Sequence, residues 1–122
     1  MKMCINTAER YKWGDNYDCW LLHKCSELSV WHKVLPPRRA EARHFHNYSQ
    51  QFFYILSGSA VLKIPGKNIE LKPQEGYSVP PLVPHQLCNE TDSSLDYLVT
   101  SQPDFKGDIV FVEGKVSSGM HT

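Results

Sequence analysis

Short apolar runs separated by polar turns occupy most of this chain, and almost none of them has the periodicity of a helix. Residues 52–56 and 60–64 are separated by Ser57-Gly58-Ser59 and predict a β-hairpin with glycine in its turn. β-Branched and aromatic side chains favour the same extended conformation elsewhere. Further strands are expected at 20–24, 29–35, 69–71, 77–79, 85–89, 96–100 and 109–112.

These runs recur with turns every ~8–12 residues, a spacing typical of an all-β sandwich or barrel. A weak helical pattern is confined to residues 1–11. Pro36 and Pro37 end one strand, and the charged stretch 38–43 that follows is expected to be a loop. We expect one all-β domain over residues 1–113, followed by a flexible, polar tail over 114–122.

Length and charge narrow the possible functions. A chain of 122 residues supports one hydrophobic core. Its 13 basic side chains balance 13 acidic ones, so bulk charge favours neither a nucleic-acid partner nor an anionic membrane. No run of ~18 apolar residues predicts a transmembrane helix, and the first residues lack the apolar core of a signal peptide. The expected location is therefore cytoplasmic.

Four cysteines lie far apart in the sequence, and no pair has CxxC spacing. In a reducing cytoplasm the expected state is four free thiols. A disulfide between Cys19 and Cys25, facing each other across a hairpin, is the alternative.

Six histidines are many for so short a chain, and three of them can gather. His44 and His46 flank Phe45, so in a strand both imidazoles lie on one face, about 7 Å apart along it. His85 follows Pro84 at the start of a later strand and can point into the same interior. Three buried imidazoles without partners would be costly, so a shared divalent cation is the economical explanation. The alternative for the His44–His46 pair is an exposed polar strand face.

Two stretches in the middle of the chain resemble the motifs of the cupin superfamily. The first motif is matched by His44-x-His46-x4-Gln51-x6-Gly58, and the second by Pro80-x-Leu82-x2-His85-x3-Asn89 after Gly76. The resemblance implies a double-stranded β-helix (jelly-roll) barrel, and small cupins commonly form homodimers. It also implies one divalent transition metal ion, whether Zn, Ni, Fe, Mn, Co or Cu, held by His44, His46, Gln51 and His85.

Three positions depart from these motifs. Arg38 and Leu82 stand where cupins have glycine, and Gln51 stands where they have glutamate. An amide oxygen is a neutral, weaker ligand than a carboxylate, so the bound ion would keep its full double charge. With Gln51 in this position, we expect weaker metal affinity, stronger attraction of anionic ligands and the loss of a possible catalytic base. The alternative is a degenerate cupin whose polar cluster holds only water.

Residues near the predicted ligands are candidates for a substrate pocket, namely Phe53, Asn89, His32 and Arg43. The resemblance implies a metal-dependent enzyme of the dioxygenase or isomerase type, acting on a small anionic or chelating molecule. No catalytic base is identified, and no residue is assigned to an organic cofactor. The alternatives are a non-catalytic module that binds a metal or small ligand, and a metal-free cupin of the sugar-epimerase type. The metal-type H-x-H spacing disfavours the last of these.

Overall fold

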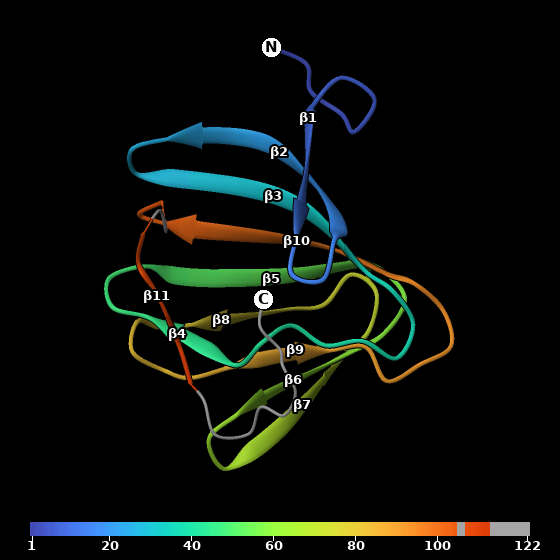
Figure 1. The fold of residues 1–122 in the computed structure, drawn as a ribbon, viewed down its shortest axis with the longest axis vertical. Coiled ribbons are helices and arrows are strands. Elements are labelled where there is room, and N and C mark those ends of the chain that lie inside the picture. The colour runs from blue at the N-terminus through green and yellow to red at the C-terminus, as the bar shows by residue number, and fades with distance from the viewer. Residues whose placement is uncertain (105–106, 113–122) are drawn as a thin grey trace.

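The computed structural model describes residues 1–104 and 107–112, and these residues form β-strands joined by turns and loops (Figure 1). Within the described ranges no helix is long and apolar enough to cross a membrane. The strands are β1 (Glu9–Trp13), β2 (Tyr17–Cys25), β3 (Leu28–Leu35), β4 (His44–His46), β5 (Gln50–Ser57), β6 (Ala60–Ile64), β7 (Lys67–Leu71), β8 (Gly76–Val79), β9 (Gln86–Cys88), β10 (Leu95–Gln102) and β11 (Ile109–Phe111).

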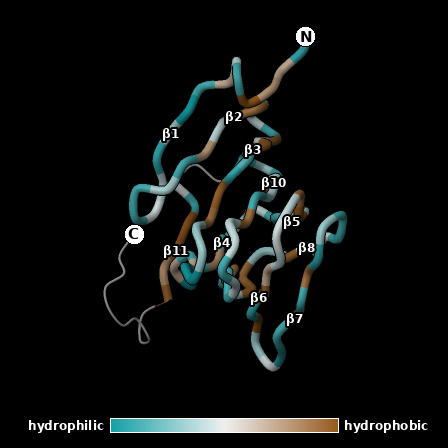
Figure 2. The backbone as a smooth tube through the Cα atoms, turned by 90° about the vertical axis from the view of Figure 1, so that its right-hand side faces the viewer, coloured by the Kyte–Doolittle hydropathy of each residue, from teal (hydrophilic) through white to brown (hydrophobic). Residues whose placement is uncertain are grey.

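The strands form three antiparallel sheets that are not joined into one closed barrel. The largest has the order β1-β2-β3-β10-β5-β8, and the others have the orders β7-β6-β9 and β11-β4. Figure 1 shows β2, β3, β10, β5 and β8 as successive rungs, with β9, β6 and β7 continuing at the lower end. β1, at one edge of the large sheet, is exposed and largely hydrophilic (Figure 2). Charged residues on an edge strand discourage pairing with another chain.

The core lies on one face of the large sheet, because residues of its central strands alternate between buried and exposed. Along β5, Phe53 and Ile55 are buried, and along β10 the buried positions include Tyr97 and Val99. In the register of the sheet Val99 lies opposite Phe53, and Tyr97 lies opposite Ile55. This period of two turns one face of each strand toward the interior, as the sequence pattern predicts.

The predicted hairpin around Gly58 is wrong. β5 pairs with β10 and β8, whereas β6 pairs with β7 and β9, so the turn carries the chain from one sheet to another. Gly58 has φ of 88°, and a Cβ added there would lie 2.6 Å from the Ser94 carbonyl oxygen. The hairpin forms one turn later, between β6 and β7, with Gly66 in its turn.

Other predictions have mixed outcomes. The weak helical pattern over residues 1–11 is not a helix, since β1 begins at Glu9. The strands expected at 20–24 and 29–35 are present as β2 and β3, which form an antiparallel pair. All four cysteines are free, Cys19 buried and Cys25 exposed, so the alternative disulfide is excluded. The predicted tail over 114–122 lies outside the described residues.

Candidate metal centre

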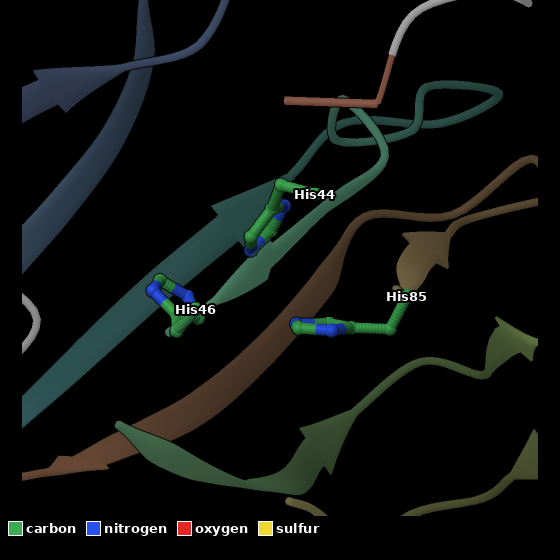
Figure 3. A group of neighbouring side chains, drawn as sticks. All are labelled: His44, His46 and His85. Carbon is green, nitrogen blue, oxygen red and sulfur yellow. The ribbon is translucent and has the colours of Figure 1, made fainter. Parts of the chain in front are cut away.

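Three histidine side chains converge where β4 meets the residue preceding β9. One ring nitrogen from each of His44, His46 and His85 lies within 4.8 Å of the others. Figure 3 shows the rings gathered from two separate segments of the chain. The residues are 6%, 2% and 1% exposed, so solvent is largely excluded from the group. The sequence predicted this gathering.

Backbone pairing brings the two segments together. β4 alternates buried, half-buried, buried, which directs both of its imidazoles to the interior. His44 and His85 form an antiparallel bridge with reciprocal hydrogen bonds, 3.1 Å from the His44 amide and 2.9 Å from the His85 amide. The amide of Leu82 also donates to the His46 carbonyl oxygen, at 2.7 Å. The proline-rich segment is therefore anchored against β4, and His85 lies in register with His44.

Each imidazole is oriented by a backbone carbonyl at its Nδ1 atom. His44 Nδ1 lies 2.9 Å from the Ala42 oxygen, and His85 Nδ1 lies 2.9 Å from the Val83 oxygen. His46 Nδ1 lies 2.7 Å from a carbonyl oxygen in the C-terminal segment, that of Asp108. A carbonyl oxygen only accepts, so each Nδ1 carries the proton and each Nε2 carries the lone pair. All three rings thus have the tautomer that offers Nε2 as a metal ligand.

Burial keeps two of these rings, those of His44 and His85, uncharged. Burial lowers the pKa of His44 to about 4, and burial together with the nearby His44 lowers the pKa of His85 to about 4. Near pH 7 both imidazoles are therefore neutral. A neutral imidazole is the form that binds a metal ion.

Gln51 brings an oxygen to the same place from β5. It is 6% exposed, its amide nitrogen donates to Ser101 Oγ at 2.9 Å, and its Oε1 lies 3.1 Å from His85 Nε2. Both ring nitrogens of His85 thus face oxygen acceptors, while a neutral ring has one proton, held at Nδ1. The lone pair of His85 Nε2 then faces a lone pair of Gln51 Oε1, and the two repel each other. A cation coordinated by both atoms removes this repulsion, so the residues present fit a metal ion.

The structure brings one of the four predicted pocket residues to this group. The Phe53 ring lies 5.6 Å from the His85 ring, centroid to centroid. Asn89 is buried, but its amide nitrogen donates to the carbonyls of Leu35, Pro36 and Ser93, so it organises a loop.

The other two predicted pocket residues contact parts of the protein other than the three histidine rings. His32 alternates with the inward residues of β3, so its side chain lies on the other face of the sheet. There its Nε2 lies 2.9 Å from Asp96 Oδ2, and its ring packs against Trp20. Arg43 is half-buried, and its carbonyl accepts from Val112, which ties β4 to the C-terminal segment.

The sequence interpretation missed a buried carboxylate. Glu41 lies in the stretch expected to be a solvated loop, yet it is 8% exposed and its Oε2 accepts from the Leu87 amide at 3.0 Å. Burial raises the pKa of Glu41, while the positive forms of His85 and Lys33 oppose that rise. The nearby Tyr97 is fully buried and burial raises the pKa of its hydroxyl. The only signal in the sequence for a role at this centre is that Glu41 precedes His44 by three residues.

Comparison with known proteins identifies the architecture. The family model described as "Cupin domain" matches residues 31–101. An uncharacterized protein of Methanocaldococcus jannaschii is 25% identical over 84 residues, which cover 69% of this chain and 67% of that protein.

Solved structures agree with this match. A sugar phosphate isomerase from a cupin superfamily of Silicibacter pomeroyi has a TM-score of 0.75 at 22% identity, covering 85% of this chain and 76% of that one. The polyketide cyclase RemF of Streptomyces resistomycificus has a TM-score of 0.77 at 17% identity, covering 94% and 87%. The predicted double-stranded β-helix fold is confirmed.

Proposed function

The chain belongs to the cupin domain family, and from this premise we propose that it is a metal-dependent enzyme acting on a small anionic or chelating molecule. One divalent transition metal ion would be held by His44, His46, Gln51 and His85. The observation that carries this proposal is the set of three buried imidazoles whose Nδ1 protons are all committed to backbone carbonyls. A proton at Nδ1 puts the lone pair of each ring on Nε2, the atom that would bind the ion.

The ligand types limit the metal and its chemistry. Three imidazole nitrogens and an amide oxygen suit Zn, Ni, Fe, Mn, Co or Cu, and they disfavour Mg. All four ligands are neutral, so the ion would keep its double charge and polarise a substrate oxygen as a Lewis acid. The Phe53 ring beside His85 forms an apolar wall, which excludes water from that side.

Glu41 supports a proton-transfer reaction, which favours isomerase chemistry. It is the buried carboxyl group among the described residues, and its Oε2 accepts from the amide of Leu87, two residues after His85. Burial raises its pKa above the ordinary value of a carboxyl group, which is the direction that suits a group that accepts and returns a proton. In this proposal Glu41 would accept a proton from the hydroxyl-bearing carbon next to the substrate carbonyl and return it to the former carbonyl carbon. The hydroxyl proton would move to the former carbonyl oxygen, so the isomerisation involves no net oxidation.

Metal content tests the site. The protein would be purified without chelator and without nickel resin, and its metals measured. We expect about one equivalent of transition metal per chain, lost in His85→Ala. The matched control is His23→Ala, since His23 is exposed on β2 and should leave metal content unchanged. Less than about a tenth of an equivalent in the wild type would contradict the proposal.

Turnover separates an enzyme from a binding module. With a panel of enolisable sugar phosphates, diketones and hydroxy acids in deuterated water, an isomerase incorporates deuterium next to the carbonyl. Glu41→Gln should keep the metal and lose this exchange by about a hundredfold or more. Metal-loaded wild type that binds panel members without exchange or oxygen consumption indicates the non-catalytic module. Activity that survives metal removal indicates the metal-free, epimerase-type alternative.

A further inference from the structure

The C-terminal strand β11 lies against the strand that carries two of the candidate ligands. In antiparallel register Ile109 pairs with His46 and Phe111 pairs with His44. The rings of Phe111 and His44 lie 6.3 Å apart, centroid to centroid. Figure 1 shows β11 running alongside β4. One wall of the centre is therefore built by a segment about 60 residues later in the chain.

Asp108, directly before β11, contacts the centre through two different groups. Its backbone carbonyl accepts the Nδ1 proton of His46 at 2.7 Å. Its carboxylate accepts the amide protons of three successive residues, from Asn47 at 2.8 Å, Tyr48 at 2.8 Å and Ser49 at 3.0 Å. A charged acceptor makes stronger hydrogen bonds than a neutral one, so this residue is firmly held against the turn.

The turn that Asp108 holds joins two ligands. Residues 47–49 connect His46, at the end of β4, to β5, which carries Gln51. The turn has a second tie, because Ser49 Oγ donates to the Pro103 oxygen at 2.6 Å. Residues 47–49 lie between the paired residues of β4 and β5, so their amides form no hydrogen bonds between strands. The Asp108 carboxylate accepts these amide protons instead.

We propose that Asp108 is a positioning residue that completes the metal centre, an inference that rests on the proposed function. Its carboxylate fixes the distance between His46 and Gln51, and its carbonyl holds His46 in the tautomer that presents Nε2. Docking of residues 107–112 and metal binding are then coupled. By linkage, a metal ion that favours the docked segment is itself bound more tightly when the segment is docked.

The test uses two independent readouts on metal-free and zinc-titrated protein. Imidazole ¹H–¹⁵N correlation spectra report the tautomer of His46 without metal, and competition titration reports zinc affinity. Asp108→Ala keeps the backbone carbonyl but removes the carboxylate that holds it against His46, so His46 should become a mixture of tautomers and zinc binding should weaken about tenfold to hundredfold. Asp108→Asn keeps one acceptor oxygen and should have intermediate effects, which covers the case that the alanine variant does not fold.

Two control variants separate positioning from general loosening. Asp18→Ala removes a carboxylate on β2 that forms ion pairs with Arg10 and Lys12 on β1, and it should change neither readout. Ser49→Ala loosens the same turn and should keep the His46 tautomer. A folded Asp108 variant with the wild-type tautomer and zinc affinity within about twofold overturns the inference. Wild type that binds no zinc overturns the proposed function instead, because the tautomer measurement still decides the role of Asp108.

Discussion

Gln51 is the residue that most distinguishes this centre from the usual cupin ligand set. Its amide nitrogen donates to Ser101 Oγ, and a hydroxyl can reverse its role and donate to a carboxylate. Glutamate therefore fits at this position without an unpaired partner. As a ligand, Gln51 would be neutral and would leave the charge of a bound ion uncompensated.

Gln51→Glu should therefore increase metal affinity, by about tenfold to hundredfold, because a carboxylate is a stronger ligand than an amide. The affinity would be measured by competition with a chromophoric chelator. Gln50→Glu is the matched control, since Gln50 is the exposed neighbour on the same strand. Equal affinity in Gln51→Glu and wild type would argue that residue 51 is not a ligand.

The low pKa values of His44 and His85 make the metal-free protein sensitive to acid. Their folded pKa values of about 4 lie below the ordinary value of 6.5, so the unfolded chain binds more protons between these limits. Stability is therefore present above pH ~6.5 and is lost as the pH falls toward ~4, by on the order of a few kcal/mol. Glu41, whose pKa is raised, acts in the opposite sense.

Urea unfolding of metal-free protein at pH 4.5, 5.5 and 6.5 measures this loss. His44→Gln removes one of the two rings and should flatten the dependence. A wild-type stability that does not change across this range would mean that the two histidines are charged, or solvated, in the folded state.

At the scale of elements, Gly58 is the corner at which the chain leaves one sheet for another. Gly58→Ala should destabilise the fold by more than about 2 kcal/mol, because the methyl group would lie 2.6 Å from a backbone oxygen in a left-handed conformation. Gly66→Ala has similar positive φ but no atom within 4 Å, so it should cost only about 1 kcal/mol. Denaturant unfolding of both variants checks the difference, and equal costs would contradict the steric argument.

Local pattern predicted most of the strands, though not β1, and it predicted the three candidate histidines, since period-two burial and the H-x-H spacing are properties of short segments. It did not predict which strands pair, so the turn at Gly58 was interpreted as a hairpin although its strands join different sheets. Glu41 and Asp108 were missed for the same reason. Their partners, Leu87 and His46, are set by long-range register, which no local pattern encodes.

At the scale of the whole molecule, the candidate ligands come from all three sheets. His44 and His46 lie on the β11-β4 sheet, Gln51 lies on the large sheet, and His85 precedes β9 of the third sheet. A bound ion would therefore reinforce the backbone bridge between His44 and His85 and tie both segments to Gln51 on the large sheet. The homodimer expected of small cupins stays a prediction, which light scattering tests.

Metal binding should accordingly stabilise the fold as a unit. At zinc concentrations about 100 times the dissociation constant, the gain is about 2.7 kcal/mol, seen as a rise in Tm with zinc. Each tenfold increase in zinc should add about 1.4 kcal/mol. His85→Ala should lose this dependence, and His23→Ala should keep it. A Tm that zinc does not change in the wild type would contradict a centre shared by the sheets.

The carbonyl-bound Nδ1 protons of His44 and His85 have a consequence for the thermodynamics of metal binding. A thiolate site must release protons as it takes up metal, whereas these two neutral imidazoles already carry a lone pair at Nε2 and keep their Nδ1 protons. His44 and His85 should therefore release no protons when the ion binds near neutral pH. Calorimetry of zinc binding in buffers of different ionisation enthalpy measures the released protons, and a release of about two or more would contradict this expectation.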